Sequence, residues 1–203
     1  QDYSTPAGAV AALQNPNLAV RRHAFLALED MGKKAVPELE KLWHAKTNPR
    51  MRARALWVLV NIPGGLKYVE EAIKDDNPDI RITGIRAARE LNANVIGVVR
   101  QLVTDRDPQV RRECALALRH RREPEAARLW AQLAAQHDGN DRWYLEALGI
   151  GADRQWDNFF MAYLKINPNP LQTAAGRDIV WRARTDKAVP MLAELEIGRE
   201  PCR

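Results

Sequence analysis

A short motif recurs along the chain at intervals of about 30 residues. In each copy, an Asn-Pro or Asp-Pro pair precedes an apolar residue and an arginine. The pairs are Asn15-Pro16, Asn48-Pro49, Asn77-Pro78 and Asp107-Pro108, and the arginines are Arg21, Arg52, Arg81 and Arg111. Successive arginines are 31, 29 and 30 residues apart. A period of this length is typical of repeat proteins, in which each unit packs only against its neighbours.

Each motif has the chemistry of a helix start. An Asn or Asp side chain accepts hydrogen bonds from the free N–H groups of a first helical turn, and proline is favoured beside it. Four, seven and eight residues after the apolar anchor the sequence is apolar or small, which predicts one buried helix face. The first of these positions holds Ala24, Ala55, Gly84 or Cys114. We call these arginine-bearing segments B helices.

A second set of amphipathic segments alternates with the B helices and supplies their partners, the A helices. These segments lie near residues 36–43, 68–73, 95–102 and 126–133. A fifth pair is expected at 123–136 and 141–150, and a sixth at 156–164 and 171–184, after the Asn-Pro-Asn-Pro break at 167–170. A further A helix begins at 189–195 without a visible partner, so we expect the chain to be cut from a longer protein.

The repeat resembles HEAT repeats, whose B helices typically open with an acidic or amide residue, proline, an apolar residue and arginine. We therefore predict an all-α fold, a right-handed α-solenoid of about six HEAT-like helical hairpins. One domain covers residues 1–203, with regular repeats over about 7–150 and irregular ones over about 151–198.

Three further segments, residues 111–120, 137–149 and 176–182, resemble one family of exported bacterial proteins. It comprises the membrane-bound dehydrogenase-like proteins of the PVC-type haem-binding kind. The resemblance implies that such a segment lies between a dehydrogenase-like β-propeller and a c-type cytochrome domain, in the periplasm or outside the cell. The chain itself has no Cys-x-x-Cys-His, signal peptide or membrane-length apolar run, so no cofactor and no membrane insertion are expected of it.

The charge is concentrated in the first part of the chain. Residues 1–122 carry 21 Lys and Arg against 14 Asp and Glu, whereas residues 123–203 carry 10 against 12. We interpret Arg21, Arg52, Arg81 and Arg111 as a structural ladder that reaches a turn Asn or Asp, or a carbonyl of the adjacent repeat. The candidates for binding on the concave face are Arg22, Arg54, Arg86, Arg112, Arg119, Trp143, Trp181 and Arg182.

No catalytic or metal-binding motif is present in the sequence. The histidines, His23, His44, His120 and His137, show no ligand spacing, and residues 137–141 predict a helix–helix turn rather than a calcium loop. Cys114 and Cys202 are too few for a disulfide framework. No residue is therefore expected to be catalytic.

Three functions remain open. The first is a non-catalytic scaffold that spaces or docks neighbouring domains or a protein partner. The alternative is a nucleic-acid-binding module like the HEAT-like DNA glycosylases, for which Trp156-Asp157 is the one adjacent tryptophan–acid pair; it lies in the acidic half, which disfavours nucleic acid. The third is an acidic ligand, such as an anionic glycan, held by the arginines.

Overall fold

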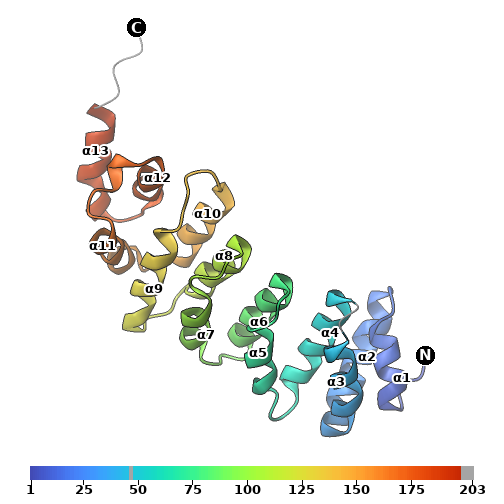
Figure 1. Ribbon diagram of the computed structural model, residues 1–203. Helices are drawn as coiled ribbons and strands as arrows, with labels where there is room; N and C mark the ends of the chain where they lie inside the picture. Colours follow the sequence, from blue (N-terminus) through green and yellow to red (C-terminus); the bar gives the residue numbers. More distant parts are fainter. Residues whose placement is uncertain (46–47, 198–203) are drawn as a thin grey trace. The chain divides into compact units, whose positions relative to one another are not determined.

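The computed structural model describes residues 1–45 and 48–197, and these residues form helices and no strand (Figure 1). The all-α prediction is confirmed. The chain divides into two compact units, Gln1–Ala93 and Asn94–Arg203. Each unit is a set of stacked helical hairpins, which is the α-solenoid architecture expected from the repeat.

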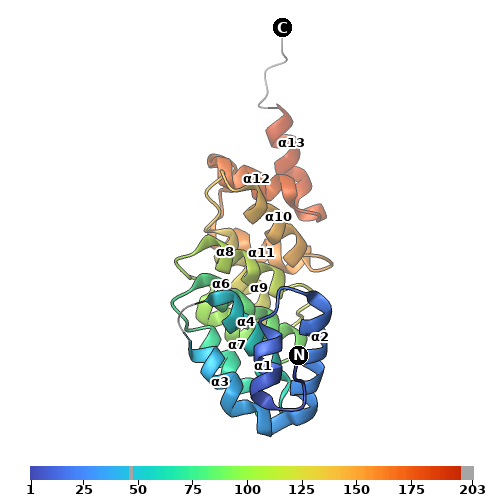
Figure 2. The same ribbon diagram turned by 90° about the vertical axis from the view of Figure 1, so that its right-hand side faces the viewer.

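Unit 1 contains three hairpins. Their helices are α1 (Pro6–Leu13) with α2 (Leu18–Met31), α3 (Val36–His44) with α4 (Pro49–Asn61), and α5 (Leu66–Ala72) with α6 (Pro78–Glu90); a 3₁₀ turn, η1 (Gly32–Ala35), precedes α3. Figure 2 shows α1 and α2 side by side. Across hairpins, α1 contacts α3, while α2 contacts α4 and α4 contacts α6, so A helices form one layer and B helices the other.

Unit 2 repeats this arrangement. Its hairpins are α7 (Val95–Leu102) with α8 (Pro108–Ala117), α9 (Pro124–Ala134) with α10 (Arg142–Gly151), and α11 (Trp156–Ile166) with α12 (Ala174–Arg182); α13 (Val189–Ile197) follows, and the 3₁₀ turns are η2 (Pro170–Gln172) and η3 (Asp186–Ala188). The A helices α7, α9 and α11 contact one another in order, as do the B helices α8, α10 and α12.

The predicted caps hold three of the B helices. The side chains of Asn48, Asn77 and Asp107 accept hydrogen bonds from the first-turn N–H groups of α4, α6 and α8, and a proline follows each cap. In the first repeat the cap is Asn17 rather than Asn15. Asn15 instead accepts a hydrogen bond from the Asn17 N–H at 2.8 Å, which closes the turn just before the helix.

Small residues on the B helices allow close packing. Ala24, Ala55, Gly84 and Cys114 are all buried, as their position in the repeat predicts. A Cβ atom on Gly84 would lie 3.0 Å from the Ala72 Cβ atom of α5, so this contact leaves little space for a side chain. Cys202 lies outside the described residues.

The sixth B helix is shorter than predicted. The sequence indicates a helix over 171–184, but the α-helix begins only at Ala174, after the 3₁₀ turn η2. Thr173 interrupts it, because its backbone is extended and its hydroxyl caps the Gly176 N–H at 3.0 Å. Gly176 also lets α12 approach this turn, since a Cβ atom there would overlap the Pro170 carbonyl.

The ends of the B helices share one backbone feature, a residue with positive φ. A residue with positive φ follows each of the first five: Gly32 (55°), Gly64 (90°), Asn92 (48°), His120 (61°) and Arg154 (60°). A left-handed residue is the usual way to end a helix and turn the chain, and glycine occupies it most easily. At His120 and Arg154, residues with a Cβ atom adopt a positive φ that glycine adopts more easily, so the backbone is strained at these two positions.

Two glycines of α10 provide a matched test of packing. A Cβ atom on Gly151 would overlap the backbone carbonyl of Ala115 in α8, whereas one on Gly149 would meet only the end of the Arg182 side chain. We expect Gly151→Ala to lower the free energy of unfolding by about 1–3 kcal/mol through overpacking. Gly149→Ala should stay within about 1 kcal/mol of wild type, because alanine favours helix and the arginine can move. Urea denaturation measures both, and equal losses would contradict this reading.

Candidate functional site

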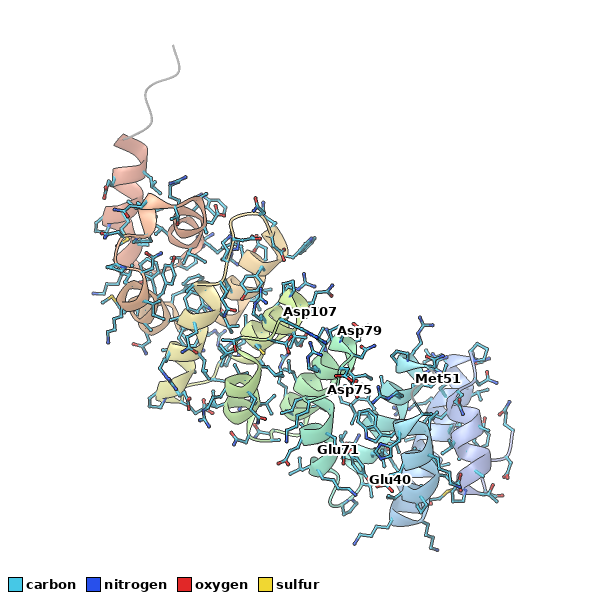
Figure 3. All side chains as sticks on the ribbon, in the orientation of Figure 1. Glu40, Met51, Glu71, Asp75, Asp79 and Asp107 are labelled. Carbon is cyan, nitrogen blue, oxygen red and sulfur yellow. The ribbon has the colours of Figure 1, made fainter. Side chains whose placement is uncertain are left out.

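The ladder arginines bind the turns of their own hairpins. The Nη1 atoms of Arg21, Arg81 and Arg111 each donate to a main-chain carbonyl six residues earlier, at 3.0, 2.8 and 2.6 Å. Arg52 is different, because its Nε donates to the Trp43 carbonyl at 2.8 Å and its guanidinium pairs with Asp75 of the next hairpin (Figure 3). The main-chain carbonyls that accept from these four arginines thus lie in the same hairpin as the arginine, rather than in the adjacent repeat.

Arg177 is a further rung that the sequence analysis missed. Its Nη1 donates to the Leu171 carbonyl at 2.9 Å, again six residues earlier. The motif was hidden because a threonine, Thr173, caps this helix in place of an Asn or Asp followed by proline. In the other repeats the arginine lies four residues after the residue that caps the helix, and a search for this spacing would have found Arg177.

Unit 2 contains an arginine-rich cleft with a volume of about 770 Å³. It lies where α8, α10 and α12 end and α11 begins. Four arginines and two aspartates line it, together with neutral residues. The charged lining residues are Arg119, Asp153, Arg154, Asp157, Arg182 and Arg184. Two of the predicted binding residues, Arg119 and Arg182, are brought together here.

One side of the cleft is fixed by Asp153. Its Oδ2 atom accepts from the Arg119 Nη2 at 2.8 Å and lies 3.1 Å from the Nε2 of His120. The hydrogen bond from Arg119, and then that from His120, lowers the pKa of the Asp153 carboxyl below its ordinary value. Asp153 therefore stays ionised and holds the end of α8 against the end of α10.

The other side is fixed by Glu146 of α10. Its Oε2 atom accepts from Arg182 Nε at 3.2 Å, and its Oε1 accepts from Arg142 Nε at 3.1 Å. Burial opposes ionisation of this carboxyl, but the two arginines outweigh it and lower the pKa of Glu146. Gly149 leaves the space that the Arg182 guanidinium fills.

The remaining two arginines are less constrained. Arg184 donates only to main-chain carbonyls at the end of α12, and Arg154 is exposed beside the entrance to α11. Neither has a carboxylate partner in the stretches 1–45 and 48–197. These two cations are therefore available to an anionic group in the cleft.

The other predicted binding residues lie elsewhere. Arg22 and Arg54 line a separate groove in unit 1. Arg86 is exposed on α6 and Arg112 half-buried on α8. Trp143 and Trp181 are 71% and 58% exposed, and Trp181 lines a depression between α12 and α13. Neither tryptophan lines the arginine-rich cleft.

The tryptophan–acid pair expected for base excision is not arranged for that chemistry. Trp156 is only 7% exposed and packs edge-on against Trp130, with ring centroids 5.6 Å apart. Trp156 touches the arginine-rich cleft, but a ring with so little exposed surface cannot stack a base. Asp157 accepts a hydrogen bond from the Thr185 hydroxyl.

The described residues contain no group of His, Cys, Asp and Glu side chains that could hold a metal ion, and no described helix is long and apolar enough to cross a membrane. His137 is buried beside Asp178, with Nε2 and Oδ2 3.1 Å apart, and stacks on Tyr144. Residues 137–141 form the predicted turn, with Gly139 at a φ of 83° and Asp141 capping α10.

Comparison with known families assigns the middle of the chain. Residues 66–149, which span α5 to α10, match the family described as HEAT repeats. This part of the chain is similar to HEAT repeats. HEAT repeats generally act as protein-interaction scaffolds, and their fold is typically non-catalytic. A search of curated proteins found no match to the chain.

The Asp153 cluster makes stability depend on pH. Because the folded-state pKa is lowered, the contribution of Asp153 is present above its ordinary pKa of about 4 and is lost as the pH falls below it. We expect Asp153→Asn to be less stable than wild type at pH 7 and nearly equal to it near pH 2. Urea denaturation across this range at low salt measures the difference. Arg119→Gln should reduce it, and a difference that grows on acidification would contradict the assignment.

Proposed function

We propose that this chain is a non-catalytic protein-interaction scaffold that docks an acidic surface of a partner in the arginine-rich cleft of unit 2. The observation that carries the proposal is the convergence of four arginines from the ends of α8, α10 and α12 on one hollow. Arginine is enriched at protein interfaces because its planar guanidinium makes several hydrogen bonds to carboxylates at once.

The charge of the cleft supports an acidic partner. Its lining carries four positive and two negative side chains, so it keeps an excess of positive charge. Asp153 engages Arg119, while Arg154 and Arg184 make no carboxylate contact within the described part of the chain. An incoming carboxylate can therefore bind without first displacing an internal one.

The resemblance of the sequence suggests which partner this is. In the exported dehydrogenase-like family, the neighbours of such a segment are a β-propeller and a c-type cytochrome domain of the same polypeptide. We propose that the chain spaces or docks these domains, in the periplasm or outside the cell. This version rests on the resemblance alone.

The proposal is tested with a fluorescein-labelled acidic peptide, (Glu-Glu-Gly)₄. The intact chain should bind it with an affinity that falls as salt rises. The double variant Arg154→Glu with Arg184→Glu should weaken binding by about tenfold or more, because two attractive contacts become repulsive. Lys187→Glu, an exposed charge reversal in the same unit outside the cleft lining, is the matched control and should change the affinity less than twofold. Fluorescence anisotropy measures all three.

Two results would overturn the proposal. In the first, the chain binds a 24-base-pair DNA duplex with a steep salt dependence and does not bind the peptide. This result would favour the nucleic-acid alternative. The second is turnover of sugar alcohols with an artificial electron acceptor by the purified chain, which would show catalysis.

A further inference from the structure

An apolar groove with a basic rim lies between α2 and α4 in unit 1. It has a volume of about 280 Å³, and its lining exposes almost only apolar surface. Its apolar lining residues are Leu18, Phe25 and Trp57, together with Leu13 at the carboxyl end of α1. Leu18 is 72% exposed although it is a large apolar residue. Exposed apolar surface of this kind, edged by polar groups, is typical of a binding site.

The rim of the groove is entirely basic. Arg21, Arg22 and Arg54 line it, and no acidic residue of the described chain does. Arg54 donates to the Leu13 carbonyl at 3.1 Å, and Arg21 to the carbonyls of the turn between α1 and α2, so both are held in place by neutral acceptors. Arg22 is exposed. The three positive charges are therefore not neutralised by the groove itself.

The electrostatics of Arg54 show the effect of this crowding. Burial lowers the pKa of Arg54, and the neighbouring charges of Arg21 and Arg50 lower it further. Arg54 nevertheless stays protonated. Its positive charge is therefore held at a position that burial and the neighbouring arginines make unfavourable for a cation. A carboxylate placed between these side chains would relieve the repulsion.

We propose that this groove binds a segment of a partner protein that carries a large apolar side chain flanked by acidic residues. The apolar side chain fills the space between Leu18, Phe25 and Trp57, and the acidic residues pair with Arg22 and Arg54. The groove, at about 280 Å³, is slightly smaller than the roughly 300 Å³ of the smallest small-ligand pockets. Its size therefore suits one or two side chains of a protein segment. Aromatic residues and arginines are also the residue types that dominate binding energy at protein interfaces.

This surface is distinct from the arginine-rich cleft. The cleft is polar and has carboxylates of its own, whereas the groove is apolar and has none among its described lining residues. The inference extends the proposed scaffold function to a second site of different chemistry. Each site can fail its test without the other.

The experiment uses three fluorescein-labelled peptides and the intact chain. The probe is Glu-Glu-Leu-Glu-Glu-Phe-Glu-Glu; a second peptide replaces Leu and Phe by Ala, and a third replaces every Glu by Lys. We expect the first to bind at least tenfold more tightly than either of the others, because binding needs both the apolar anchor and the acidic flanks. Equal affinity of the first two peptides would reduce the site to unspecific charge attraction and overturn the proposal.

Matched variants place the binding in the groove. Arg22→Glu should weaken the probe about tenfold, whereas Lys34→Glu, an exposed charge reversal beyond the end of α2, should change it less than twofold. Leu18→Ser should weaken it severalfold, and Leu66→Ser, an equally placed first helical residue that is 55% exposed, should not. Because the acidic probe can also enter the arginine-rich cleft, the comparisons are repeated in the double variant Arg154→Glu with Arg184→Glu. The effects of Arg22→Glu and Leu18→Ser should persist in that background.

Other occupants give different results. The chain could bind phosphatidylglycerol vesicles but not the probe, and lose the vesicle binding in Leu18→Ser. That result would assign the groove to a membrane surface. A concentration-dependent dimer in sedimentation that dissociates in Leu18→Ser would assign it to a second copy of the chain. Either result would overturn the proposal.

Discussion

The hydrogen bond from a B-helix arginine to a carbonyl of its own turn is the contact on which the architecture depends. In three repeats the guanidinium reaches back six residues, while an Asx turn and a capping side chain close the same short segment. These hydrogen bonds are part-buried, and the guanidinium supplies a donor to turn carbonyls that no helix hydrogen bond satisfies. With the turn fixed, each hairpin presents its small and apolar residues to the next one.

This locality explains how much of the fold could be predicted. The caps Asn48, Asn77 and Asp107 and the buried stripes follow from a few adjacent residues, so the sequence indicates them directly. The errors are also local. Thr173 caps α12 inside the segment that the apolar pattern predicted as one helix. Asn17 is the cap of α2 because Asn15 occupies the position of Asp75 and Asp105, whose side chains close the turn two residues before the cap.

The candidate sites were less predictable, because they form only when hairpins stack. Arg119 and Arg182 were among the candidates, but Asp153, which orients one of them, and Gly149, which makes room for the other, lie outside the repeat motif. The exposure of Trp143 and the burial of Trp156 follow from the same stacking. Periodicity shows which face of a helix is buried, but not which side chains of successive helices meet. The two surfaces that result are chemically different, one polar and one apolar, so the two proposed sites select partners of different chemistry.

The reach of the ladder arginines also bears on how the chain acquires its structure. Their hydrogen bonds to main-chain carbonyls join residues only five to nine positions apart. A topology dominated by such short sequence separations has low contact order, and low contact order goes with rapid folding. Each new hairpin therefore needs only the neighbouring hairpin to pack against, not distant parts of the chain.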